Sequence, residues 1–200
     1  MSLTPVQVLP EKAEYLVPTW QDLDRLTFQL SKKIRQDFQP FGVVALAKGA
    51  WPMSRSLVDY LGSHRLASLG VRFYTGINQR LQHPEIYQEI PVSVKGKHLL
   101  LFDDVADTGE SLIFAKNHLL KLGAAEVRTA SIFLKPRSEI LPDYYASETA
   151  AWIIFPFERF EMLRLLNENW QQQGVSEAAR NERFLSLGFP KNVIRYYFPT

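Results

Sequence analysis

Alternation of short apolar runs with amphipathic segments is the feature of this sequence that most restricts its fold. The apolar runs have the length and composition of strands buried on both faces, and they lie at 41–47, 98–104, 126–135 and 151–157. Other segments repeat apolar residues every three or four positions, as amphipathic helices do, at 19–38, 52–62 and 109–123. Strands that alternate with helices predict an α/β fold, with a mostly parallel twisted sheet flanked by helices.

The remaining segments are expected to be less regular. A short strand is predicted at 71–75, and the polar stretch from there to about residue 96 contains two prolines. Residues 136–149 have the composition of a loop. The tail from about residue 159 reads as two helices, followed by a segment that begins as a third. We interpret this tail as a small appendage that adds packing or a dimer contact.

Composition excludes several classes of site. The 200 residues include no cysteine, so disulfides, thiolate metal sites and cysteine nucleophiles are absent. The formal net charge of +2 argues against a strongly basic surface for nucleic acid or anionic membrane. The N-terminus lacks the basic-then-apolar pattern of a signal peptide, and no apolar run approaches the length of a membrane span. A cytoplasmic protein is expected, with no nucleic-acid or membrane partner.

Three acids cluster where the strand at 98–104 ends. Asp103 and Asp104 close an apolar run, and Asp107 follows just before a helix that begins at about Gly109. Ligands of parallel sheets bind beyond the carboxyl ends of the strands. Turn capping by the acids is the alternative interpretation, and two adjacent acids directly after four apolar residues fit it poorly.

The start of the next helix suits a phosphate. A helix N-terminus offers unbonded backbone N–H groups and the positive end of the dipole. Gly109 allows close approach of the backbone, and Thr108 and Ser111 add hydroxyls. The stretch therefore predicts a ligand with a phosphate at one end and diol hydroxyls, or their magnesium ion, at the other, which is the form of a phosphorylated ribose.

The segment LLLFDDVADTGES, residues 99–111, closely resembles the phosphoribosyl-pyrophosphate signature of the type I phosphoribosyltransferases. The resemblance implies the fold of that family, with a small hood, over roughly residues 19–160. It implies that Asp103 and Asp104 bind the ribose and that Asp104 also contacts Mg²⁺. The ribose and phosphate contacts carried over in this way are Asp103, Asp104, Val105, Ala106, Asp107, Thr108, Gly109, Glu110 and Ser111.

An earlier strand ends in a basic residue and a glycine, as in the family. Lys48 and Gly49 of VALAKGA then bind pyrophosphate, and the resemblance implies a cis Ala47–Lys48 peptide. Many relatives have a second glycine where this chain has Ala50, a departure that bears on the flexibility of the loop. The alternative is that Lys48 is an ordinary surface lysine.

Downstream residues resemble the purine branch of the family, which includes bacterial xanthine-guanine and archaeal hypoxanthine/guanine enzymes. Lys135 of SIFLKP stands where a lysine reads the 6-oxo group of the base. In WIIFPFE, Trp152 and Ile153 correspond to the base-stacking aromatic and its neighbour, and Glu158 to an acid near a second Mg²⁺. Phe157 replaces the more usual tryptophan. Trp152 as a plain core aromatic is the alternative.

The resemblance implies a Mg²⁺-dependent enzyme that transfers the phosphoribosyl group from phosphoribosyl pyrophosphate to a 6-oxopurine and releases pyrophosphate. Asp107 is the implied catalytic residue, because it can manage the N7 proton of the base. The loop at 76–96 would act as a lid, with Tyr74, Thr75 and Arg80 as candidate pyrophosphate contacts. Residues 1–158 would form the catalytic domain with its hood and residues 159–200 a C-terminal helical extension, in a homodimer. The alternative function is a non-catalytic regulator of the same fold that binds the ribosyl donor or a nucleotide.

Overall fold

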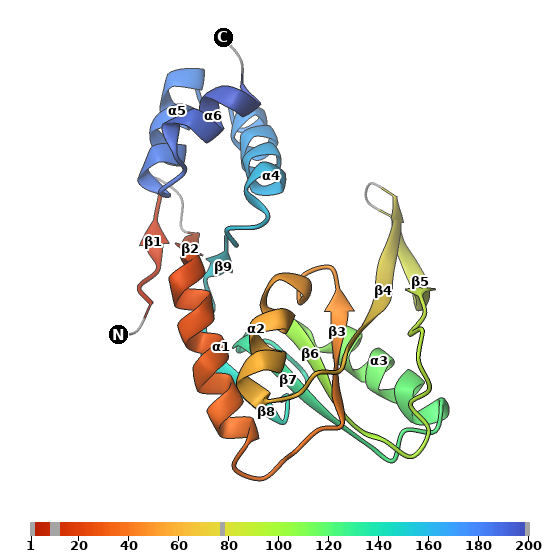
Figure 1. Cartoon of the computed structure of the whole chain (residues 1–200). Coiled ribbons are helices and arrows are strands. Elements are labelled where there is room, and N and C mark those ends of the chain that lie inside the picture. The colour runs from red at the N-terminus through yellow and green to blue at the C-terminus, as the bar shows by residue number, and fades with distance from the viewer. Residues whose placement is uncertain (1–2, 9–12, 77–78, 199–200) are drawn as a thin grey trace. The chain divides into compact units, whose positions relative to one another are not determined.

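The computed structural model describes residues 3–8, 13–76 and 79–198, without the side chains of 73–83. The chain forms two compact units. One unit comprises Leu23–Thr149, and the other comprises the described residues of Met1–Asp22 and Ala150–Thr200. Figure 1 labels the elements of both.

The Leu23–Thr149 unit is built on a six-stranded sheet with the order β5-β4-β3-β6-β7-β8 (Figure 1). All neighbouring strands are parallel except β4 and β5, which form an antiparallel pair. The bounds of the strands are β3 Gly42–Ala47, β4 Leu66–Gly76, β5 Gln79–Gln88, β6 His98–Ala106, β7 Glu126–Leu134 and β8 Tyr144–Glu148.

The strand order reverses between β3 and β6. The chain leaves β3 through helix α2 (Trp51–Leu61) to reach β4, and it leaves β6 through α3 (Glu110–Lys121) to reach β7 on the other side. Figure 1 shows α2 and α3 on opposite faces of the sheet. Such a reversal is the topological switch point at which open α/β sheets bind ligands.

Two helix ends coincide with caps that the sequence provides. Helix α1 spans Trp20–Ile34, and Thr19 and Asp22 form a capping box before it, with Thr19 Oγ1 accepting from Asp22 N at 3.1 Å and Asp22 Oδ2 accepting from Thr19 N at 3.0 Å. Helix α2 ends at Gly62, which adopts the left-handed conformation (φ 69°). The apolar core between α3 and the sheet includes Leu101, which is fully buried.

The second unit combines both ends of the chain. Strands β1 (Val6–Gln7), β2 (Glu14–Leu16) and β9 (Trp152–Ile153) form a small sheet with the order β1-β2-β9. Three helices follow, α4 Arg159–Gln172, α5 Glu177–Ser186 and α6 Lys191–Tyr197. Their buried side chains pack with residues of the small sheet around Trp170 and Phe184, whose rings lie 4.9 Å apart.

The structure confirms the α/β class with helices on both faces, and it corrects several predicted boundaries. The helix predicted over 19–38 ends at Ile34, because residues 35–37 turn through i→i+3 hydrogen bonds such as Asp37 N to Ile34 O. The apolar run ending at Asp104 continues as strand to Ala106. The strand predicted at 71–75 begins at Leu66.

The predicted irregular regions contain two strands. β5 lies within the polar stretch after residue 76, and β8 lies within the predicted loop 136–149. Both are edge strands, which need no continuous apolar pattern because one side of the ladder faces solvent. The run at 151–157 yields only the two-residue β9, which pairs with β2 and not with the main sheet. No helix among the described residues is both long and apolar enough to cross a membrane.

Candidate active site

The switch point brings the predicted pyrophosphate loop and the paired acids to neighbouring strands. Lys48 and Gly49 follow β3, and Asp103 lies near the end of β6. The two strands pair in parallel, with Ala45 opposite Phe102, so both groups reach the same edge of the sheet. The Ala47–Lys48 peptide is cis, as the sequence resemblance predicts.

The backbone of Gly49 lies directly against the Asp104 carboxylate. A Cβ built on Gly49 would stand 2.6 Å from Asp104 Cγ, closer than real Cβ atoms come to their neighbours. Glycine is therefore required at this position because a side chain would collide with the carboxylate. The φ angle is not the reason, since Gly49 is not among the glycines with positive φ. The loop after β3 and the acids of β6 form one continuous surface.

Asp103 and Asp104 are poorly solvated and adjacent. Asp104 is 8 % exposed, and its Oδ1 accepts a hydrogen bond from Val105 N at 3.0 Å, while Asp103 Oδ1 accepts from Asp104 N at 3.0 Å. Burial raises the pKa of Asp103 to about 6. Burial and repulsion from Asp103 raise the pKa of Asp104 well above its usual range. Two such carboxylates are stabilised by a cation or by hydroxyl donors.

The donor set of this pair fits magnesium that is shared with a substrate. Mg²⁺ prefers oxygen ligands and commonly binds through one or two carboxylates together with substrate phosphates. Within the described parts of the chain, no cluster of three or more His, Asp or Glu side chains could hold a metal ion by itself. A bound cation would offset the burial and the mutual repulsion that raise the pKa values of Asp103 and Asp104.

The helix after this loop, α3, begins directly after a glycine. Gly109 is the N-cap of α3 with φ 85°, and it supplies no side chain to bond the first-turn N–H groups. A Cβ on Gly109 would stand 2.7 Å from Ile140 Cβ, so the loop after β7 packs against it. The same loop donates Glu139 N to Thr108 O at 3.1 Å. The turn before α3 is thereby fixed, and Thr108 Oγ1 accepts from Glu110 N within it at 3.4 Å.

Asp107 has a partner that sequence reasoning did not identify. Arg137 Nε donates to Asp107 Oδ1 at 2.8 Å and Arg137 Nη2 to Oδ2 at 2.7 Å, a bidentate pair. Arg137 comes two residues after Lys135, and this proximity is the signal that could have suggested it. The pair fixes the orientation of the Asp107 carboxylate.

Lys135 follows β7 at the same edge of the sheet. Its side chain is only 8 % exposed, and burial lowers the pKa of its ammonium group, an effect that Asp107 opposes and Arg137 reinforces. Its backbone N donates to Ala106 O at 3.0 Å. A buried lysine of this kind is a group that can donate a hydrogen bond to a ligand with little loss of hydration on binding.

Three predicted residues, Trp152, Ile153 and Glu158, lie in the other unit. Trp152 is 54 % exposed, which contradicts its alternative interpretation as a core aromatic, whereas Ile153 is buried. Glu158 is the N-cap of α4 and makes no side-chain capping bond. In the predicted lid, β4 and β5 run antiparallel with Tyr74 opposite Arg80. The side chains of Tyr74, Thr75 and Arg80 lie outside the described residues.

Comparisons with known proteins agree with this geometry. The family model of the phosphoribosyl transferase domain matches residues 19–160. A crystal structure of purine phosphoribosyltransferase from Pyrococcus horikoshii is 33 % identical, with a TM-score of 0.65, and the match covers 72 % of this chain and 93 % of that one. The xanthine-guanine phosphoribosyltransferase of Gluconobacter oxydans is 26 % identical over 152 residues, which are 74 % of this chain and 88 % of the relative.

A third protein agrees in fold. The xanthine-guanine-hypoxanthine phosphoribosyltransferase of Helicobacter pylori has a TM-score of 0.65 at 19 % identity, and the match covers 75 % of this chain and 98 % of that one. The family model spans well over half of the chain, including the switch point, the signature loop and the segment after β7. The chain therefore belongs to the phosphoribosyltransferase family.

Proposed function

We propose that this protein transfers the 5-phosphoribosyl group from phosphoribosyl pyrophosphate to a 6-oxopurine, namely hypoxanthine, guanine or xanthine, and releases pyrophosphate. One observation carries the proposal. Asp103 and Asp104 lie near the end of β6, and the Lys48–Gly49 loop and Lys135 follow the neighbouring parallel strands β3 and β7 at the switch point. Two relatives, a purine phosphoribosyltransferase and a xanthine-guanine phosphoribosyltransferase, support the same substrate class. The regulator alternative gains no support from these relatives.

The donor would lie across the edge of the sheet at β3 and β6. Asp103 and Asp104 would accept hydrogen bonds from the ribose diol, and backbone amides between Val105 and Ser111 would bind the 5-phosphate at the start of α3. Lys48 and Gly49 would bind the pyrophosphate. Magnesium, which Asp104 and Glu158 would help to hold, supplies Lewis-acid neutralisation of the leaving pyrophosphate.

The base would be read from the segment after β7 and from β9. Lys135 donates to O6 of a 6-oxopurine, and its ammonium group would meet the amino group of adenine badly, because both are donors. Trp152 would stack on the base, a role that its exposed ring supports. Ile153 would contribute main-chain contacts.

The chemical step would be attack of a purine nitrogen on C1 of the ribose as the bond to pyrophosphate breaks. Positive charge develops on the ribose in such a transition state, so water must be excluded, a role we assign to the segment at 76–96. Asp107 would take the N7 proton of the base. Arg137 would hold that carboxylate in position.

A panel of bases tests the proposal. The full chain is mixed with phosphoribosyl pyrophosphate, Mg²⁺ and one base at a time, and nucleotide formation is followed by chromatography. Turnover is expected with hypoxanthine, guanine or xanthine, and little with adenine or uracil. Binding of the donor without turnover of any base would favour the regulator.

A variant checks the base pocket within the same panel. Lys135→Ala should lower kcat/KM for the 6-oxopurine by about 10- to 1000-fold, the range for loss of a charge-assisted hydrogen bond with some misplacement of the base. The KM for phosphoribosyl pyrophosphate should change little. An equal fall in the affinity for phosphoribosyl pyrophosphate would show that Lys135 does not bind the base.

Further proposals concern the domain boundary, the oligomeric state and the location of the protein. We propose that residues 1–158 act as the catalytic domain with its hood, that residues 159–200 form an accessory extension, and that the protein works as a cytoplasmic homodimer. Light scattering coupled to gel filtration checks the dimer, and truncation after Glu158 checks the boundary by whether turnover survives. A monomer with full turnover would contradict the dimer.

A further inference from the structure

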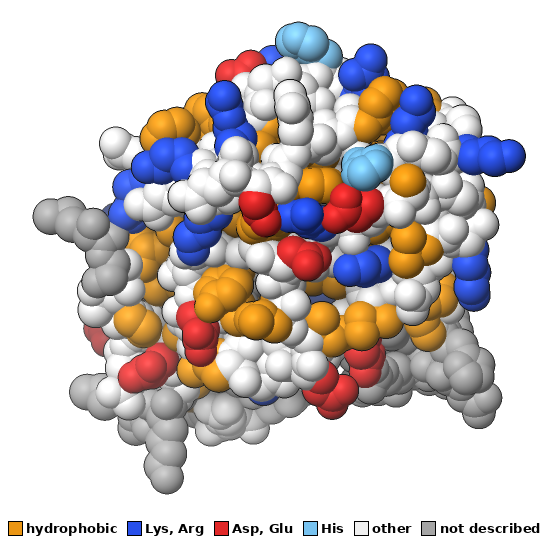
Figure 2. Space-filling model, turned by 90° about the horizontal axis from the view of Figure 1, so that it is seen from below, with side chains coloured by type: hydrophobic (Ala, Val, Ile, Leu, Met, Phe, Trp, Pro, Cys, Tyr) orange, Lys and Arg blue, Asp and Glu red, His pale blue; other side chains and the backbone are white. Residues whose placement is uncertain are grey.

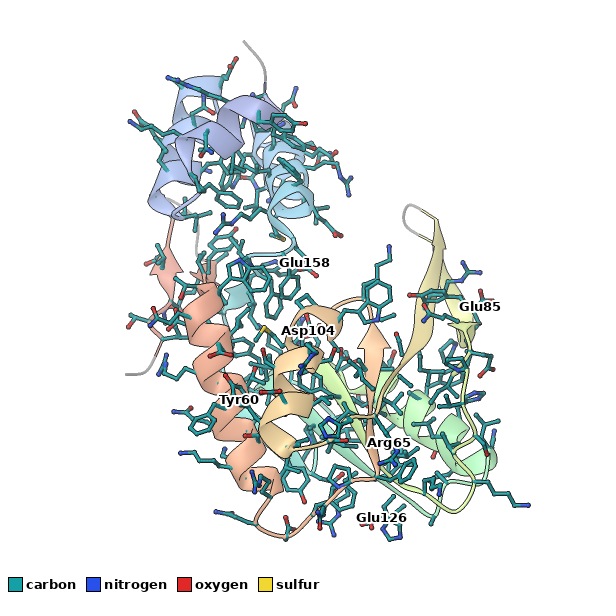
Figure 3. The ribbon with its side chains drawn as sticks, in the orientation of Figure 1. Tyr60, Arg65, Glu85, Asp104, Glu126 and Glu158 are labelled. Carbon is teal, nitrogen blue, oxygen red and sulfur yellow. The ribbon has the colours of Figure 1, made fainter. Side chains whose placement is uncertain are left out.

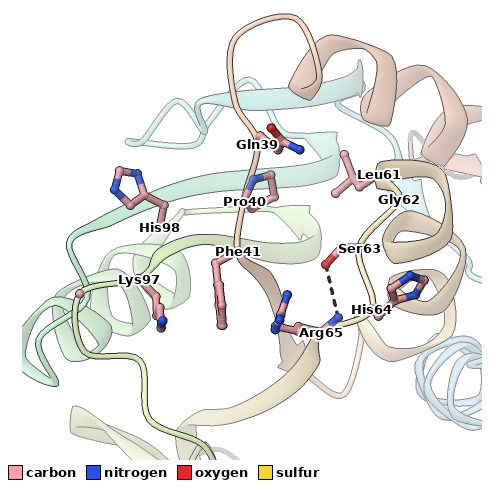
Figure 4. Close-up of a pocket in the computed structure, with 11 residues that line it drawn as sticks. Gln39, Pro40, Phe41, Leu61, Gly62, Ser63, His64, Arg65, Lys97 and His98 are labelled. Atoms are coloured by element: carbon pink, nitrogen blue, oxygen red, sulfur yellow. Dashed lines mark hydrogen bonds between the residues drawn. The ribbon is translucent and has the colours of Figure 1, made fainter.

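A second hollow lies at the opposite end of the main sheet, where strands β3 and β6 begin. Its volume is about 520 Å³, within the range of small-molecule sites. Basic side chains dominate its polar lining, with Arg65, Lys97, His64 and His98 around the ring of Phe41 (Figure 4). Figure 2, seen from below, shows lysine, arginine and histidine side chains spread over this face among apolar and acidic ones.

The arginine and the lysine of this hollow both make cation–π contacts with one aromatic ring. Arg65 Cζ lies 4.2 Å and Lys97 Nζ 4.3 Å from the centroid of the Phe41 ring. Figure 4 shows them on opposite sides of that ring. No described carboxylate forms an ion pair with either cation, so their charge is not neutralised within the described part of the protein.

The acid that borders the hollow is already engaged. Glu126 Oε1 accepts from Arg128 Nε at 2.7 Å, and Glu126 Oε2 lies 2.9 Å from His98 Nδ1. Arg128 also pairs with Asp37 at 2.8 Å, so Glu126, Asp37 and Arg128 together carry one negative charge. Arg65 and Lys97 carry two positive charges, so the local excess at the hollow is one positive charge. A concave surface with unpaired cations attracts anions more strongly than a flat one, because its walls focus the field.

An apolar hollow adjoins the basic one. It has a volume of about 370 Å³ and shares Phe41, His64 and Arg65 with its neighbour. Its other lining is largely aliphatic, including the exposed side chains of Leu66 and Val92. A ligand that spans both hollows would carry negative charge at one end and an apolar or flat ring at the other.

We propose that this end of the sheet binds a nucleotide with at least two phosphate groups. Arg65 and Lys97 stand on opposite faces of one ring, so a single phosphate reaches one of them well, whereas a diphosphate spans both. Both faces of Phe41 are occupied by these cations, so the base is assigned to the apolar hollow. The shared chemistry is a diphosphate, with or without an attached nucleoside.

This site is separate from the switch point. Figure 3 shows Arg65 and Glu126 at one end of the Leu23–Thr149 unit and Asp104 toward the other. Strand β3 has six residues between the two edges, which corresponds to roughly 20 Å at the usual rise per residue. One nucleotide cannot contact both places, so the proposal goes beyond the transferase reaction and does not depend on it.

Titration calorimetry of the full chain with ADP tests the proposal. The Arg65→Ala/Lys97→Ala protein is compared with wild type and with Lys121→Ala/Arg195→Ala, which removes the same two charges from exposed positions outside the hollow. Loss of two charge-assisted contacts should weaken ADP binding about 100-fold or more, and the control should bind like wild type within about twofold. Added salt should weaken the wild-type affinity.

Two further ligands separate the contribution of the diphosphate from that of the nucleoside. Pyrophosphate should bind Arg65 and Lys97 more weakly than ADP, and adenosine should bind weakest, because it lacks charge. Equal affinity for ADP and pyrophosphate would reduce the proposal to an inorganic diphosphate site. Equal ADP affinity in wild type and in the double variant would overturn it, since ADP would then bind elsewhere, as at the switch point.

A second variant guards against misfolding. Ser63→Asp adds a negative charge to the hollow and leaves the stacking on Phe41 intact, since the Ser63 hydroxyl accepts from the backbone N of Arg65, at 3.3 Å, and takes no part in the ring contacts. It should also weaken ADP binding about 10-fold or more, with transferase turnover within about twofold of wild type. If it bound ADP as wild type does, the site would be rejected even where the double variant failed to fold.

Discussion

Arg137 holds both carboxylate oxygens of Asp107 in a bidentate pair, at 2.8 and 2.7 Å. Both side chains are about half exposed, so such a pair adds little to stability, on the order of 0–1 kcal/mol. Its geometry matters more, because a bidentate contact fixes a carboxylate plane against rotation. We infer that Arg137 is a positioning residue for Asp107.

Kinetics of a double-mutant cycle check this role. Asp107→Asn should reduce kcat by roughly 10²–10⁴ with little change in the KM for the donor. Arg137→Ala should reduce kcat by about 10- to 100-fold, and in the Asp107→Asn background its further effect should be under about threefold, because both changes disturb one unit. Independent, multiplying losses would show that Arg137 acts elsewhere. Melting temperatures should barely differ across the four proteins.

Removal of the paired acids should stabilise the protein when metal is absent. Asp103→Asn/Asp104→Asn keeps the oxygens that accept from Asp104 N and Val105 N and removes two poorly solvated charges that repel each other. We expect a gain of about 1–3 kcal/mol in the free energy of unfolding with EDTA at neutral pH. Phosphoribosyl pyrophosphate with Mg²⁺ should stabilise wild type and not the variant. A variant less stable than wild type in EDTA would contradict this account.

The contact between Gly49 and Asp104 predicts that no side chain is tolerated at position 49. Gly49→Ala places a Cβ 2.6 Å from Asp104 Cγ, so loop or carboxylate must move, and a shift of this size can cost about 100-fold in kcat/KM for the donor. Gly62→Ala is the matched control, since no atom lies within 4 Å of its added Cβ. The control should lose stability, by about 1 kcal/mol, with unchanged donor kinetics. Similar donor kinetics in both variants would show that glycine is not required at position 49.

Burial of Lys135 gives a pH dependence of stability. The pKa of its ammonium group is lowered in the folded protein, whereas the unfolded chain titrates near 10.5. Between these values the unfolded chain binds more protons, so the contribution of Lys135 to the free energy of unfolding rises with pH. Wild type should therefore gain stability relative to Lys135→Met as the pH rises toward about 10.5, measured by urea unfolding. A constant difference would indicate that the ammonium group is not desolvated.

Sequence patterns predicted the central part of this fold and missed its edges. The strands at the switch point, β3 and β6, are buried on both faces, so continuous apolar runs identified them. Strands β5 and β8 lie at the edges of the sheet, where a polar sequence is tolerated, and neither was predicted. Strands β1 and β2 pair with β9, a contact between distant parts of the chain that no local pattern reports.

The same limit applies to the candidate site. Residues of LLLFDDVADTGES are consecutive, so their motif could be read directly, and Lys48 and Lys135 could be placed because each follows a buried strand. Arg137 lies in an irregular segment, and its pairing with Asp107 depends on how the loop after β7 packs on Gly109. That packing is a tertiary contact between segments thirty residues apart, which spacing alone does not predict.

The parallel pairing of β3 with β6 determines when the transferase site forms during folding. Ala45 and Phe102 are partners in the sheet but far apart in the chain, and a parallel pair cannot be closed by a short turn. Such long-range closure is slow compared with helix formation. The transferase site can exist only after this closure and the addition of β7, so no early folding intermediate or N-terminal fragment ending before Leu134 can carry it. Recovery of catalysis during refolding should therefore lag behind recovery of helical structure.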